Sequence, residues 1–286
     1  MFTIARLTFL EVLRKKVFFV TAILSVAFVF LYGLALDFTA QEMLRMKAMR
    51  GAPLMMQQMI GNQLLGAGLY FSSFLIALLS MLASVGSISA EIENGLLHAI
   101  VSKPMRRREI ILGKFLGYGS MLSVYAVALY LAVLALNSHY HPGVFSLATT
   151  RDLTFGAFIF VLQPLVILGV ALVLSTVFRT LTAGIVSIIL YGLGMVGGFL
   201  EQIGSAIANA KLVSIGIATS LLMPSDALYR KIIAVVTGSE ANPLSVLSLG
   251  PFGVSAPPSN AMLVYVMFYV LISVGLAMYI FERKDL

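Results

Sequence analysis

The stretch AEIENGLLHAIVSKPMRRREIILGKF, from Ala90 to Phe115, decides how the rest of the chain is interpreted. It places three acids and five bases in one short connector, whereas the sequence on either side is a long apolar run. A basic loop that only fixes topology would explain the three consecutive arginines, but not the order of acids, short apolar segment, proline and bases. We therefore interpret residues 90–109 as a short helix and loop held at a membrane surface to meet a soluble partner.

The composition of the chain identifies lipid as its solvent. Of its 286 residues, 60% are hydrophobic and 11% are charged, whereas soluble domains have roughly 45–50% and about 25%. The chain contains no cysteine, which excludes disulfides, thiolate catalysis and cysteine metal sites. Its net charge of +7 fits anionic lipid and the positive-inside bias, and we expect no nucleic-acid partner.

Six segments are long and apolar enough to cross a membrane as helices, which takes roughly 20 residues. We predict an all-α polytopic membrane protein with a single transmembrane domain over residues 1–286. The expected spans are Val17–Leu36, Gln63–Ser89, Leu116–Leu136, Phe155–Phe178, Leu181–Leu200 and Ala261–Phe281.

Two further segments are expected at the membrane surface. Residues 1–16 have a polar and an apolar face, which predicts an amphipathic interface helix, the alternative being a basic tail. Residues 201–260 form an outer-side segment of short helices and loops. Within it we predict a re-entrant or interfacial helix at 203–223. The alternative, a seventh span, would bury Lys211 at a cost of about 2.5–3.5 kcal/mol. The stretch PSDALYRKI, Pro224–Ile232, reads as a loop.

The distribution of lysine and arginine predicts the orientation. With six spans both termini lie on one side, and that side receives 12 of the 19 bases in short segments. We therefore expect a multi-pass protein of the cell (inner or plasma) membrane with both termini in the cytoplasm.

The connector also carries a recognisable order of residues. E-x-E-x-G, a short apolar segment and then S-K-P-x-x-R-R-E-I-x-x-G-K-F resemble the signature of the membrane permeases of ATP-binding-cassette (ABC) exporters of the second type. Among these, the chain is most similar to stand-alone permeases of the copper-enzyme-maturation and multidrug or lipid export kind. The segment MPSDALYR, Met223–Arg230, resembles one found in the outer region of that family.

The resemblance implies that the connector is a coupling helix seated on a separate ATPase subunit. Leu96 departs from the pattern, since the family often has threonine there. The coupling residues implied by the match, or by their place in this helix and its basic end, are Glu91, Glu93, Gly95, His98, Lys103, Pro104, Arg106 and Arg108.

ATP hydrolysis is expected on another chain, so this chain is not expected to be an enzyme. A phosphate-binding loop needs G-x-x-x-x-G-K-[S/T], but the pair Gly113-Lys114 is preceded by Arg108 in place of the first glycine and followed by Phe115. No cofactor is expected here, while ATP and Mg²⁺ would bind the ABC ATPase partner. The resemblance also implies a homodimer, and we consider an outer-side accessory protein.

Other residue patterns leave alternatives open. Small-residue pairs are candidates for packing or for the dimer contact: Gly113 with Gly117, and Gly194 with Gly198. Met43, Met46 and Met49 are weak candidates for Cu(I), because thioether is a soft ligand, but nearby bases favour a simple amphipathic helix and no metal. His139 and His141 are expected in a solvated loop.

The function we expect is ATP-driven export of an amphipathic or lipid-like cargo, because the spans contain mild polar groups and few charges. The alternatives are an ion-coupled secondary carrier, a component of a copper-enzyme maturation system, and a scaffold without transport.

Overall fold

The computed structural model describes residues 2–50, 54–95, 107–145, 148–238, 254 and 257–284. Over these ranges the chain forms helices and no strand. The elements are α1 (Phe2–Arg14), α2 (Lys16–Arg50), α3 (Leu54–Ser84), α4 (Ser89–Glu93), α6 (Arg107–Tyr140), the short 3₁₀ helix η1 (Pro142–Phe145), α7 (Thr150–Val177), α8 (Thr180–Ala206), α9 (Ala210–Leu222), α10 (Ser225–Val236) and α12 (Asn260–Glu282).

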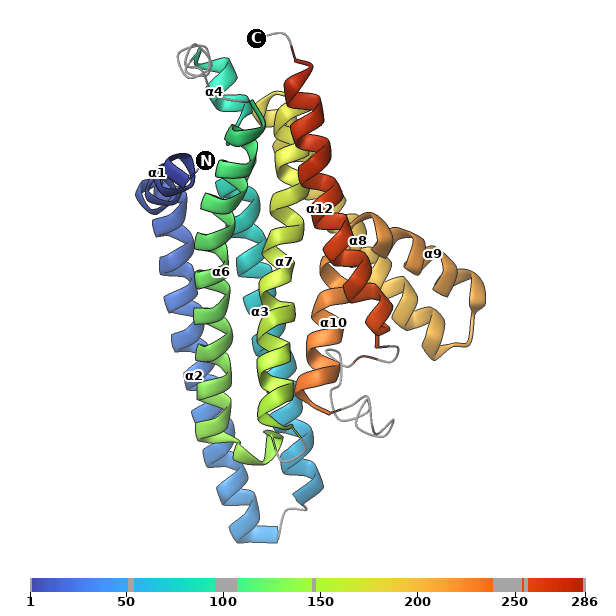
Figure 1. Cartoon of the computed structure of the whole chain (residues 1–286). Coiled ribbons are helices and arrows are strands. Elements are labelled where there is room, and N and C mark those ends of the chain that lie inside the picture. The colour runs from blue at the N-terminus through green and yellow to red at the C-terminus, as the bar shows by residue number, and fades with distance from the viewer. Residues whose placement is uncertain are drawn as a thin grey trace.

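Six of the described helical stretches are long and apolar enough to cross a membrane, which confirms the predicted all-α, six-span architecture. They are α2, α3 together with α4, α6, α7, α8 and α12. Both termini, α4 and the α7–α8 junction lie at one end of the bundle, which we call the basic end (top of Figure 1). The C-terminal end of α2, the N-terminal end of α3 and the short helix η1 after α6 lie at the opposite end.

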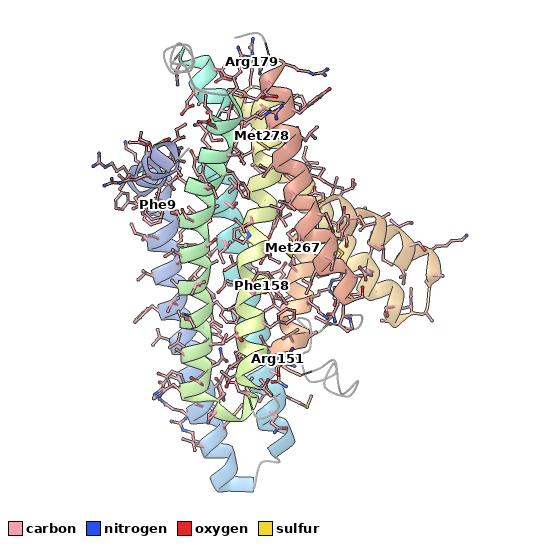
Figure 2. The ribbon with its side chains drawn as sticks, in the orientation of Figure 1. Phe9, Arg151, Phe158, Arg179, Met267 and Met278 are labelled. Carbon is pink, nitrogen blue, oxygen red and sulfur yellow. The ribbon has the colours of Figure 1, made fainter. Side chains whose placement is uncertain are left out.

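Helix α7 is the centre of the bundle. It packs against α3, α6, α8, α10 and α12, and 67% of its most apolar window is buried, compared with 17% for α2. A capping box between Thr149 and Asp152 starts α7. Arg151 and Arg179 lie at its two ends (Figure 2), so the apolar length between them is bracketed by charge. Outer helices such as α2 therefore present large apolar side chains to lipid or to a partner.

The amphipathic helix predicted at 1–16 is present as α1, which lies across α6 at the basic end (Figure 1). Gly117 makes this crossing close: a Cβ there would lie 2.6 Å from the carbonyl oxygen of Ala5 and from the Cβ of Thr8. The predicted partner of this glycine, Gly113, is buried on the same helix. At Gly117 the small residue thus serves packing within the chain.

The segment after the fifth span differs from the prediction. Helix α8 runs on past the expected end at Leu200 to Ala206, and α9 folds back against it. Pro224–Ile232 is not a loop: after a bend of 106° it forms most of α10, whose residues are buried against α7, α8 and α3. The pairing of Asp226 and Arg230 inside the protein, described below, offsets part of the cost of this burial.

Glycines on α8 allow this close packing. A Cβ at Gly194 would clash with the backbone carbonyl of Met223, and one at Gly198 would clash with the carboxylate of Asp226. Both predicted packing residues therefore contact α9–α10 segments of their own chain.

At the opposite end, the expectation of a solvated histidine loop is wrong for one residue. His139 is exposed, but His141 is buried, and its Nε2 lies 3.3 Å from Oγ1 of Thr39. Burial lowers the pKa of His141. Met43 is buried as well, whereas the side chains of Met46 and Met49 lie outside the described residues.

Candidate functional site

The first part of the connector, α4, is held in place by the end of α7. The hydroxyl of Ser175 accepts hydrogen bonds from the backbone N–H groups of Ile88 (3.1 Å) and Ser89 (3.0 Å). Free N–H groups at a helix start need such acceptors. Because Ser175 is fully buried, the start of α4 is attached to the centre of the bundle.

Glu91 fastens α4 to the third span. Its Oε1 accepts a hydrogen bond of 2.6 Å from Nζ of Lys114 on α6. The same Nζ also donates to the carbonyl of Ser87. The side chains of Lys114 and Glu91 are 4% and 21% exposed, so this ion pair is largely shielded from water. Sequence reasoning matched both residues to the family signature and assigned Glu91 to ATPase coupling, but it did not predict the contact between the two side chains.

Glu93 fastens α4 to the fifth span. One carboxylate oxygen accepts from the backbone N–H of Thr180 (3.0 Å) and the other from its hydroxyl (3.1 Å). Thr180 is the first residue of α8, so the carboxylate also meets the positive end of that helix dipole. Ser89 adds a hydroxyl contact of 2.9 Å to the same threonine.

The glycine predicted to belong to the motif has a backbone reason to be there. Gly95 has φ +71°, a left-handed conformation that favours glycine, and its N–H donates to the carbonyl of Ile92. It therefore ends α4. The other predicted coupling residues, His98, Lys103, Pro104 and Arg106, lie outside the described residues, as does Leu96.

The connector re-enters the described part at Arg107, where the C-terminal end of α12 meets it. Arg108 forms two hydrogen bonds with the carboxylate of Glu282, of 2.5 and 2.8 Å, and Arg107 donates to the carbonyl of Lys284. Nζ of Lys284 in turn donates to the carbonyl of Thr176 at the end of α7. Sequence reasoning missed these contacts, because it used the bases near the C-terminus only to predict the orientation.

Lys15, the residue directly after α1, links α1 to α6 at this end of the bundle. Its Nζ donates to the hydroxyl of Tyr118 (2.9 Å) and pairs with Glu11 (3.1 Å). Burial alone would lower the pKa of Lys15, but Tyr118 and Glu11 together raise it above its ordinary value, so the ammonium stays charged.

The residues that attach α4 to the spans are Glu91, Glu93, Lys114, Ser175 and Thr180, and we call them the anchor network.

A second cluster lies deep in the bundle and was not predicted. Arg230 is 1% exposed; its Nε donates to Asp226 (3.0 Å) and its Nη2 to Glu201 (2.6 Å). The spacing of Asp226 and Arg230, four residues apart on what is a helix, is the signal that could have indicated the first of these contacts.

Comparison with protein families agrees with this architecture. The family model described as "ABC-2 family transporter protein" matches residues 2–286. The chain belongs to the ABC-2 transporter family. A comparison with curated proteins gives no match.

Membership of the ABC-2 family identifies the chain as the membrane component of an ABC transporter, and such a component implies an ABC ATPase partner. In this setting, the anchor network connects the start of the connector to three separate spans. Among the described residues no group of three or more His, Asp or Glu side chains is arranged to hold a metal ion.

Proposed function

We propose that this ABC-2 chain is the membrane subunit of an ATP-driven exporter and couples ATPase closure to movement of its spans through the connector at 90–109. The observation that carries the proposal is the anchor network: α4 is attached to α6 through Lys114, to α7 through Ser175 and to α8 through Thr180.

The attachment explains how a force on the connector would reach the pathway. A helix of five residues has too few internal hydrogen bonds to be rigid alone. Fixed to three spans, it moves only with them, so displacement of the connector tilts α6, α7 and α8 together. In this proposal Glu91 and Glu93 link α4 to the spans, and the residues that follow Gly95 contact the ATPase.

The basic end is cytoplasmic in this proposal, because it holds both termini and the short basic segments. The cargo is amphipathic or lipid-like. The hydroxyl and amide groups inside the spans, such as Ser72, Ser73 and Gln163, offer hydrogen bonds without a chain of free charges. Two copies of this chain act with two ATPase subunits.

The test uses the complex of this chain with its ABC ATPase, purified from co-expressing cells. We expect Glu91→Lys with Glu93→Lys to abolish vanadate-sensitive ATP hydrolysis that co-purifies with the chain, because both changes place a base against a base or a helix N-terminus. Glu42→Lys is the control, since Glu42 pairs with Arg45 on the surface at the opposite end. A fully active ATPase complex with the double variant would refute the coupling assignment.

A further inference from the structure

At the end of the bundle opposite to the basic end, His141 stands at the junction of α6 and η1. Pro142 follows it, and the residue before a proline avoids helical geometry, so α6 ends at Tyr140 and the chain turns. The backbone N–H of His141 still donates to the carbonyl of Asn137 (2.8 Å), and its carbonyl accepts from the N–H of Val144 (3.1 Å). The backbone of His141 is therefore fixed by α6 on one side and by η1 on the other.

The imidazole fills the space between this turn and the nearby ends of α2 and α3. His141 is 7% exposed, and its Nε2 lies 3.3 Å from Oγ1 of Thr39 on α2. On α3, a Cβ at Gly61 would lie 3.5 Å from the Cβ of His141 and 2.5 Å from Cγ2 of Val144. The missing side chain at Gly61 thus lets α3 close on the histidine, so that α2, α3, α6 and η1 meet around one ring.

The partner of Nε2 decides where a second proton would go. Oγ1 of Thr39 lies 2.9 Å from the carbonyl oxygens of both Ala35 and Leu36, so its own proton is directed to one of them. The hydroxyl oxygen is left as an acceptor, and Nε2 of the neutral ring therefore carries the N–H. Protonation adds an N–H at Nδ1, which forms no hydrogen bond with a described residue.

No described acid on the elements around His141 balances a charge on its ring. On α2, Asp37 accepts a hydrogen bond from the glutamine one turn on, and Glu42 pairs with Arg45. Helices α3 and η1 carry no charged residue, and His139 near the end of α6 is exposed. Burial is the cause that lowers the pKa of His141, and no described charge offsets it.

Protonation therefore works against the closed packing. Above 6.5, the ordinary pKa of histidine, the ring is neutral whether it is packed or exposed, and the packing has its full stability. As the pH falls below that value, an exposed ring binds a proton before a packed one does, so the packing loses stability. We propose that His141 is a proton-sensitive latch, which holds the nearby ends of α2 and α3 against α6 and η1 when neutral and releases them when protonated. The latch is separate from the proposed export function and does not depend on it.

The released region is short, because a second set of contacts joins the same helices one turn deeper. Nδ2 of Asn137 on α6 donates to the hydroxyl of Tyr32 on α2 (2.6 Å), which donates to the carbonyl of Leu64 on α3 (2.8 Å). An amide, a phenol and a backbone carbonyl do not titrate at neutral or mildly acidic pH. We therefore expect the opening to be confined to the chain beyond Tyr32 and Asn137.

The test measures distances within the purified chain in detergent. Because the chain has no cysteine, spin labels can be placed on exposed positions of α2 and α6: Leu44→Cys with Ser138→Cys near the latch, and Val26→Cys with Val124→Cys deeper in the bundle. Labelled protein is diluted with unlabelled protein, so that only distances within one chain count. Between about pH 7.5 and about pH 5, where histidine titrates, the latch pair should gain a longer distance reversibly, while the deeper pair stays unchanged.

Variants assign the response to one ring. His141→Gln keeps a side-chain N–H for Thr39 but cannot be protonated, so it should lose the pH response, whereas His139→Gln should keep it. If His141→Gln does not fold, nuclear magnetic resonance of the parent with labelled histidines should show His141 titrating below 6.5, together with the change in distance. A latch pair that does not respond to pH, the same response in His141→Gln, or an equal change in the deeper pair would overturn the proposal.

Discussion

Lys114 lies in the most basic stretch of the chain, yet its ammonium points into the protein. It is 3% exposed and bonded to Glu91 and Ser87. Arg108, nearer the start of the same helix, makes two hydrogen bonds with Glu282, but this pair is exposed to water. Shielding from water, and not the number of hydrogen bonds, decides which of these pairs matters for stability.

Replacing Lys114 by Met should destabilise the protein by about 3 kcal/mol, because Glu91 would be left partly buried without a counter-charge. Thermal unfolding in detergent measures this, and adding Glu91→Gln should restore most of the loss. Arg108→Gln, which breaks the exposed pair, should leave the unfolding midpoint unchanged. A Lys114→Met protein as stable as the parent would contradict the role given to this ion pair.

Two glycines in the spans give a contrasting pair of substitutions. At Gly198 on α8 an added methyl group would overlap the carboxylate of Asp226, whereas at Gly275 on α12 it would meet nothing within 4 Å. Gly198→Ala should cost about 1–3 kcal/mol through overpacking, and Gly275→Ala should be neutral or stabilising by up to about 1 kcal/mol. The midpoints of thermal unfolding compare the two, and equal effects would contradict the packing of α8 on α10.

At the scale of elements, the break between α9 and α10 needs help from another span. The last carbonyls of a helix have no partner in it, and lipid supplies none. The hydroxyls of Tyr265 and Tyr269 on α12 donate to the carbonyls of Leu221 and Leu222, each at 2.7 Å. Helix α12 therefore stabilises the bend.

Changing both tyrosines to phenylalanine should loosen that bend. Each lost hydrogen bond should cost about 1 kcal/mol, and amide hydrogen exchange around residues 219–226 should speed up. Tyr279→Phe is the control, because the described contact of Tyr279 is with Arg283 through its ring. Unchanged amide exchange rates in the double variant would show that the bend does not depend on the two tyrosine hydrogen bonds.

The sequence predicted the long elements well and the buried polar contacts poorly. A run of apolar residues defines a span by itself, so each expected span lies almost entirely within a helix, although α2 and α6 extend well beyond theirs. The prediction of a loop in place of most of α10 was wrong because Asp226, Arg230 and Lys231 are charged and were therefore expected to be solvated. The burial of Arg230 depends in part on Glu201, which lies 29 residues earlier in the chain. Ser175 and Thr180 carry no charge and gave no signal.

At the scale of the whole molecule, the outer face of α8 is the surface best suited to the proposed homodimer. Ile185, Ile188 and Ile189 are exposed there, and Gly192 has open space above it. Small residues on an apolar face let two helices approach closely in lipid. The exposed face of α2 carries large side chains such as Val26 and Phe30.

Because the chain has no cysteine, single cysteines can test this face directly. Ile188→Cys in native membranes should form a disulfide-linked dimer on mild oxidation, while Val26→Cys on α2 should not. Electrophoresis without reductant reads the result. Cross-linking through Val26→Cys in the absence of cross-linking through Ile188→Cys would place the interface on α2.

The close crossing of α1 over α6 at Gly117 has a mechanical consequence for the bilayer. Any tilt of α6 drags α1 with it, because the backbone of Ala5 rests on that glycine. An amphipathic helix lying among lipid headgroups cannot move without displacing them. In the proposed transport cycle, part of the work would therefore be done on the membrane, and the turnover rate should depend on the lateral pressure and surface charge of the lipids that surround α1.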